Sequence, residues 1–91
     1  MQDYLIERRI PGVGQLSADQ LKDASAVSNA ALAQVGTGIE WVSSFVTGDK
    51  TFCHYRAENE DLIREHARIS GFPADVITPI GGTISPATAT G

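Results

Sequence analysis

Hydrophobic and polar positions follow two different periods along this chain, and these periods predict strands alternating with helices. A run rich in β-forming residues covers 3–10 and stops at Pro11 and Gly12. Apolar residues then recur at helical spacing, at Leu21, Ala24, Val27, Ala31 and Val35. Ser17 followed by Gln20 has the spacing of a capping box, so we predict a helix over 17–35.

The second half of the chain predicts a hairpin, a helix and a last strand. Two apolar runs, 38–47 and 50–58, flank a Gly-Asp pair, which is typical of a β-hairpin. An amphipathic helix is predicted over 59–71, beginning at the cap Asn59 and ending at a glycine. The last strand, 75–84, contains a proline and two glycines, which favour a sheet edge or a bulge.

The order of these elements, βαββαβ, predicts an α+β fold of the ferredoxin-like kind. Two right-handed split crossovers give an antiparallel sheet of strand order 4-1-3-2 with both helices on one face. We expect a single domain over 1–84, followed by a mobile tail of small residues over 85–91. The other face of the sheet has no cover from within the chain.

The hairpin register predicts which residues lie on that open face. A two-residue turn pairs Phe45 with Phe52, Ser43 with His54, and Trp41 with Arg56 on one face. The opposite set, which fits the helix-covered face, is Val42, Ser44, Val46, Cys53, Tyr55 and Ala57. Trp41, Phe45 and Phe52 would then form an exposed apolar patch, and we predict that a second copy covers it in a homodimer.

Composition narrows the classes of partner. The chain has 91 residues and a net charge of −4, which argues against nucleic acid or an anionic membrane as the main partner. A single cysteine excludes an intrachain disulfide, and no apolar run approaches the length of a membrane span. The N-terminus lacks the features of a signal peptide, so we expect a cytoplasmic protein.

All soft metal-binding capacity falls within a short stretch that holds Cys53, His54 and His66. Cys53 is interpreted as a small buried hydrophobe, a metal ligand, or a reactive thiol. His66 is interpreted as a core histidine or as a metal or catalytic residue. Packing of the second helix over the strand before it would bring Cys53 and His66 together on the covered face.

Other polar residues are weaker candidates. His54 points to the face opposite Cys53, so it is a ligand only through a partner subunit. Glu7, in the middle of a strand, either pairs with an arginine or holds a cation. For the Arg8 and Arg9 pair, solvated surface is favoured over contact with a carboxylate substrate. The chain has no nucleophile elbow, phosphate loop or CxxC motif.

Three segments, YLIERRIPG, IEWVSSFVTGDKTFCHYRAENEDLIREHARISGFPADVIT and ISPAT, resemble a bacterial family of small domains of unknown function that includes a streptomycete nickel-binding protein. The resemblance implies a ferredoxin-like homodimer with a nickel-type ion near the subunit interface. By this resemblance, Glu7, Cys53 and His66 are the expected metal ligands. His54 and Ser43 depart from the family pattern.

The favoured function is therefore a small dimeric protein that binds a divalent transition metal, nickel before others. Its predicted ligands are Cys53, His66 and Glu7, with His54 joining only across subunits. The alternative is a small metal-dependent enzyme that acts on an unidentified small molecule in a pocket of the dimer. A plain interaction module with a core cysteine and histidine is the third hypothesis.

Overall fold

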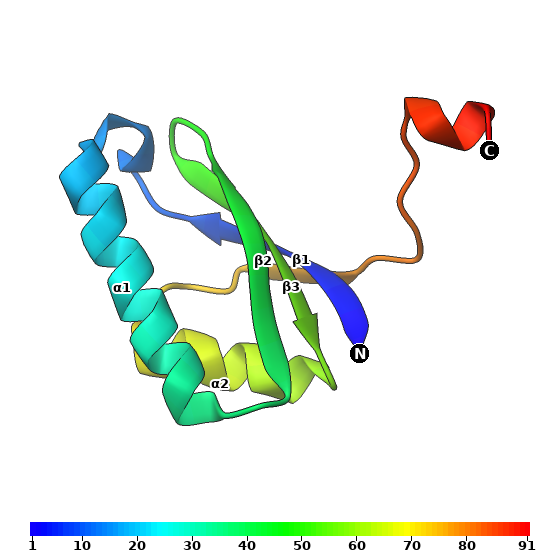
Figure 1. Ribbon diagram of the computed structural model, residues 1–91. Coiled ribbons are helices and arrows are strands. Elements are labelled where there is room, and N and C mark those ends of the chain that lie inside the picture. The colour runs from blue at the N-terminus through cyan, green and yellow to red at the C-terminus, as the bar shows by residue number, and fades with distance from the viewer.

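The structure, a computed structural model, describes residues 1–91 and has the predicted βαββαβ order. Its elements are β1 (Gln2–Arg9), a 3-10 turn (Val13–Gln15), α1 (Ala18–Val35), β2 (Ile39–Val46), β3 (Lys50–Ala57), α2 (Glu60–Ser70), β4 (Val76–Pro79) and a second 3-10 turn (Pro86–Ala89). The strands form one antiparallel sheet of order β2-β3-β1-β4. This is the predicted order 4-1-3-2 read from the other edge, so the ferredoxin-like fold is confirmed. Both helices cover the same face of the sheet (Figure 1).

The helices begin and end where the capping residues predict. The Ser17 hydroxyl accepts a hydrogen bond from the backbone N–H of Gln20, and the Gln20 side chain accepts one from the N–H of Ser17. The side chain of Asn59 caps α2 by accepting from the N–H of Leu62. Gly71 ends α2 with a φ of 81°, a left-handed conformation that favours glycine. Neither helix is both long enough and apolar enough to span a bilayer.

The last strand is shorter than the prediction of 75–84. It pairs with β1 over four residues, and the N–H of Ile80 makes one more bond to the carbonyl of Asp3. The glycines that follow carry no side chain to pack against β1, so pairing stops there. The rest of the chain extends away from the domain and ends in the second 3-10 turn, which buries no residue (Figure 1).

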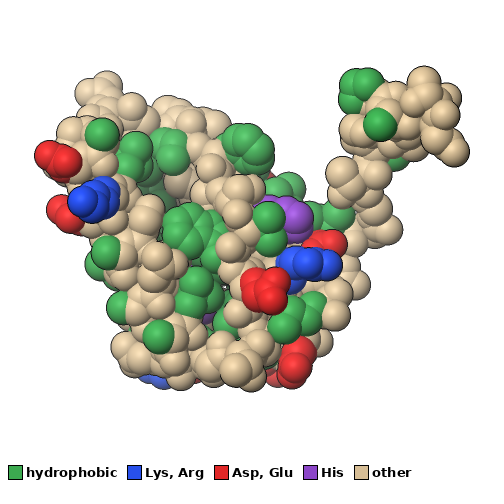
Figure 2. Space-filling model, viewed as in Figure 1, with side chains coloured by type: hydrophobic (Ala, Val, Ile, Leu, Met, Phe, Trp, Pro, Cys, Tyr) green, Lys and Arg blue, Asp and Glu red, His purple; other side chains and the backbone are tan.

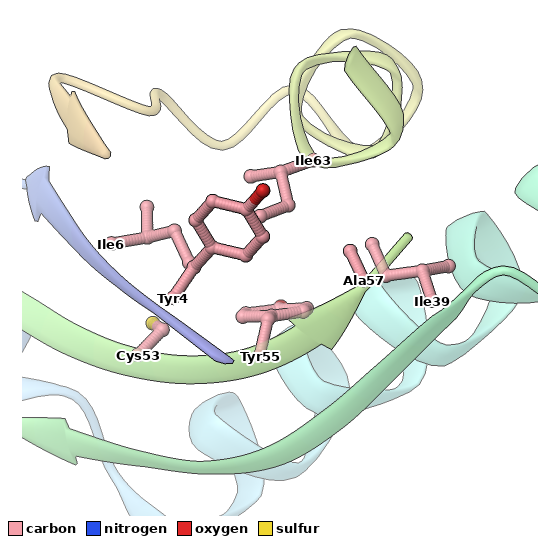
Figure 3. Packing of buried hydrophobic residues seen from close by; sticks show 7 residues of the cluster. All are labelled: Tyr4, Ile6, Ile39, Cys53, Tyr55, Ala57 and Ile63. Atoms are coloured by element: carbon pink, nitrogen blue, oxygen red, sulfur yellow. The ribbon is translucent and has the colours of Figure 1, made fainter. Parts of the chain in front are cut away.

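The core lies between the sheet and the two helices. Figure 3 shows its buried cluster, which consists of Tyr4, Ile6, Ile39, Cys53, Tyr55, Ala57 and Ile63. Ile63 points from α2 toward the side chains of β1 (Figure 3). Ile6 and Ile63 are fully buried, and each contributes roughly 1.5–3 kcal/mol of apolar burial.

A bulge in β2 changes one of the predicted faces. Phe45 pairs with Phe52 and Ser43 with His54, as predicted, but Trp41 pairs with Tyr55 instead of Arg56. The register shifts by one residue between Trp41 and Ser43, so Trp41 turns to the helix-covered face. The prediction that Trp41 lies on the open face is therefore wrong. The physical reason is that the indole stacks on the Tyr55 ring, with centroids 6.4 Å apart, in a half-buried position.

The open face of the sheet still carries apolar side chains. The strand register places Leu5, Phe45, Phe52 and Val76 on this face. Phe45, near the end of the edge strand β2, is 68% exposed, which is a large exposure for a phenylalanine side chain. The predicted homodimer stays a prediction, and Phe45 and Phe52 remain the residues on which it depends.

Candidate functional site

The sheet separates the four predicted metal ligands into two pairs. Cys53 and His66 lie on the helix-covered face, whereas Glu7 and His54 lie on the open face, because Glu7 pairs with Phe52 and His54 follows Cys53 by one residue. One ion within one chain cannot contact both pairs. In agreement, no group of three or more His, Cys, Asp or Glu residues lies close enough to hold a metal ion.

Cys53 is a buried free thiol on β3. Its Sγ lies 3.5 Å from the hydroxyl of Thr51, two residues earlier on the same strand face. Its neighbours in the core are apolar side chains, so the local environment is that of a small hydrophobe.

His66 is fully buried on the inner side of α2. Its Nε2 lies 3.2 Å from the backbone carbonyl of Ser28 on α1, and that oxygen only accepts, so Nε2 carries the proton. The same nitrogen lies 3.2 Å from the Ser28 hydroxyl, and Nδ1 has no partner. Burial lowers the pKa of His66; the Ser28 carbonyl opposes this effect, and the charge of Arg8 adds to it. The imidazole is therefore held neutral.

Tyr55 joins this histidine to the sheet. Its ring centroid lies 5.3 Å from that of His66, and its hydroxyl lies 3.4 Å from the hydroxyl of Ser28. Burial raises the pKa of Tyr55, so the phenol stays protonated at neutral pH and its O–H remains a donor. Ser28, Tyr55 and His66 thus form a buried polar cluster that links α1, β3 and α2.

On the open face, His54 is close to an acidic residue that the sequence did not single out. Its Nε2 lies 3.4 Å from Oδ1 of Asp3, but this contact lacks hydrogen-bond geometry, and Nε2 is buried without a partner. Arg56 donates to the same Asp3 oxygen over 3.0 Å. Glu7 lies on this face beside a lysine, Lys50, at 3.8 Å, rather than beside the arginine that one alternative predicted.

The prediction that Arg8 is solvated is wrong, because only 3% of its surface is exposed. Its Nη1 donates to the backbone carbonyls of Phe72 and Pro73, over 3.2 and 3.0 Å. The guanidinium lies 5.7 Å from the centroid of the Tyr55 ring, whereas Nη2 is buried with no acceptor. The period-two pattern of β1, in which Tyr4 and Ile6 face the helices, was the signal that could have placed Arg8 inside.

A cavity of about 220 Å³ lies beside this arginine, between the first half of α1 and the sheet. Hydrophobic side chains line the hollow that separates α1 from β2 (Figure 2). The polar groups on its wall include Arg8, Ser28, Thr51 and Tyr55, and Cys53 also lines it. The residues around Tyr55 therefore form the candidate ligand site of the covered face.

Comparisons with known proteins agree with this architecture. The crystal structure of SCO4226 from Streptomyces coelicolor A3(2) superposes with a TM-score of 0.72 over 90% of this chain and 99% of that chain, at 17% sequence identity. At this identity the likeness shows the ferredoxin-like fold alone. No curated protein matches the sequence. The family described as nickel responsive protein SCO4226-like matches residues 4–80, and this chain belongs to that family.

Proposed function

We propose that this protein works as a homodimer that binds a nickel-type divalent ion between the open faces of its two sheets. The family description, nickel responsive protein, supports nickel as the ion. The exposed apolar side chains of the open face support this face as the dimer interface. The proposal places the protein in the cytoplasm, where a lone thiol such as Cys53 stays reduced.

The donor pair of the open face fits a first-row transition metal. Imidazole nitrogen and carboxylate oxygen are both suitable ligands for such an ion. Two donors that bind one ion at about 2.1 Å and at right angles lie about 3.0 Å apart. His54 Nε2 and Asp3 Oδ1 are 3.4 Å apart. Arg56 donates to this same oxygen, so Oδ2 is the Asp3 oxygen left free to bind an ion. A rotation of the Asp3 carboxylate would bring Oδ2 and His54 Nε2 to one ion.

A second copy would complete the ligand set. The observation that carries the proposal is that this donor pair, too small to hold an ion alone, lies on the same face as Phe45 and Phe52. A two-fold axis through the interface doubles every residue near it, so two His54–Asp3 pairs would supply four donors. Glu7 lies on the same face and is the next carboxylate available.

Cys53 and His66 are the second candidate pair, inside the domain. They are candidates because the neutral imidazole of His66 has a free Nδ1 and lies on the same face of the sheet as the Cys53 thiol. However, no third donor joins them, and both are buried. The cavity next to Cys53 supports the alternative of a small enzyme acting there.

Calorimetric titration with nickel, combined with light scattering, tests the proposal. We expect the parent protein to bind nickel as a dimer, and His54→Ala and Asp3→Asn each to weaken binding by at least about tenfold, or ~1.4 kcal/mol. Cys53→Ser and a surface control, Asp19→Asn on α1, should bind like the parent. Phe45→Ser should lower both the mass and the nickel affinity.

The results of these titrations distinguish the His54–Asp3 pair from the Cys53–His66 pair as the metal site. Loss of binding in Cys53→Ser but not in His54→Ala would move the ion to the covered face and refute the interface site. A parent protein that stays monomeric with nickel present would refute the dimer.

A further inference from the structure

Arg8 is a buried cation that the chain itself leaves without an anion. Its guanidinium has two backbone carbonyls on Nη1 and an aromatic ring beside it, but no Asp or Glu lies within ion-pair distance. Nη2 is buried and makes no hydrogen bond. Removing a charge from water without a partner is costly, so an unpaired buried guanidinium indicates that an anion from outside the chain belongs there.

The cavity beside Arg8 has the size and the walls for the rest of such a ligand. Ten of its fifteen lining residues are hydrophobic, and Leu21, Ala24, Trp41 and Phe72 are among them. An apolar cavity of about 150 Å³ is enough to hold a benzene molecule. At about 220 Å³, this cavity has room for a ring or a short alkyl chain together with a small polar group.

We propose that the cavity between α1 and the sheet binds a small organic monocarboxylate, with the acid group on Arg8 and the apolar body against Leu21 and Trp41. A guanidinium presents paired N–H donors that match the two oxygens of a carboxylate. The protonated hydroxyl of Tyr55 is a further donor on the cavity wall. Because Arg8 lines the cavity but its Nη2 is buried, binding requires a rotation of the guanidinium toward the cavity.

The charge on the wall selects a monoanion. Arg8 is the only cation that lines the cavity, and no acidic residue lines it. A ligand with two or three negative charges would leave charge unpaired in an apolar site, and a neutral ligand would leave Arg8 as it is. This site is separate from the proposed metal site, since Arg8 and His54 point to opposite faces of the sheet.

The test titrates the protein with phenylacetate and, separately, with its neutral isostere phenylacetamide, and follows the chemical shifts in two-dimensional amide NMR spectra. We expect saturable binding of the acid, shifts centred on the Trp41 indole and the first half of α1, and at least about tenfold weaker binding of the amide. Arg8→Gln keeps a donor for the carbonyls of Phe72 and Pro73 but removes the charge, so it should abolish the preference for the acid. Arg8→Lys should retain part of it.

A pair of alanine variants on α1 keeps the proposal falsifiable if the arginine variants do not fold. Ala24→Leu fills the cavity and should abolish binding of the acid, whereas Ala26→Leu, on the exposed side of the same helix, should leave it unchanged. Equal affinity for acid and amide would overturn the proposal. So would shifts confined to the open face, an Ala24→Leu variant that binds like the parent, or no saturable binding of phenylacetate at millimolar concentration.

Discussion

The buried neutral histidine His66 predicts a loss of stability in mild acid. In the folded protein, burial lowers the pKa of His66 below its ordinary value. Protonation would charge the ring and place a proton on Nδ1, which has no acceptor. In the unfolded chain the imidazole is in water and titrates with a pKa of about 6.5.

The sign and the size of the effect follow from proton linkage. Below pH 6.5 the unfolded chain binds a proton that the native state refuses, so the free energy of unfolding falls as the pH falls. The stabilising contribution is fully present above pH 6.5 and is lost between pH 6.5 and the lowered pKa of the folded state. For one proton the slope is at most about 1.4 kcal/mol per pH unit, so the loss between pH 7.5 and 5.5 reaches about 1.4 kcal/mol at most.

Urea denaturation at a fixed protein concentration, measured at several pH values from 7.5 to 5.5, gives this slope directly. We compare the parent with His66→Gln. The His66 variant should be less stable at pH 7.5 and should lose most of the pH dependence that the parent shows in this range. A parent slope that survives unchanged in His66→Gln would refute the assignment.

Two further predictions concern the backbone. Deleting Val42 should remove the bulge but keep Trp41 on the covered face, because Trp41 and Ser43 then stand in consecutive positions opposite Tyr55 and His54. The emission wavelength of the only tryptophan should therefore stay the same, and a shift to longer wavelength would contradict this register. Gly71→Ala should lower the free energy of unfolding by about 1 kcal/mol, because the φ of Gly71 is 81°. Gly48→Ala, at a φ that other residues adopt, should be neutral or slightly stabilising in the same denaturation assay. Equal effects of the two substitutions would contradict this explanation.

Local signals were sufficient to predict the element order and most of the helix ends. The capping box at Ser17, the cap at Asn59 and the glycine that ends α2 act within a few residues of sequence, so they can be read without tertiary information. The pairing of Phe45 with Phe52 was equally local, because a two-residue turn fixes it. The fold class follows from these elements and the handedness of the crossovers.

The site was less predictable because it depends on contacts between distant segments. The bulge that turns Trp41 inward has no glycine or proline to mark it, and its cause is the packing of the indole on Tyr55, one strand away. Whether Glu7 shares a face with Cys53 depends on the register between β1 and β3, which no turn connects directly. Ser28 gave no signal at all, since its role is a contact with His66 across two helices.

The unpaired state of Arg8 is specific to its position and not a consequence of composition. The chain has eleven acidic residues against seven basic ones, so partners are plentiful. Arg56, Arg64 and Arg68, which are exposed and gain little from pairing, each have a carboxylate. Arg8, whose burial makes an unpaired charge most costly, has no carboxylate partner. Sites at which a sequence breaks the rules of packing and pairing without compensation are expected to be functional, and this is the reason for assigning the acid-binding cavity to Arg8.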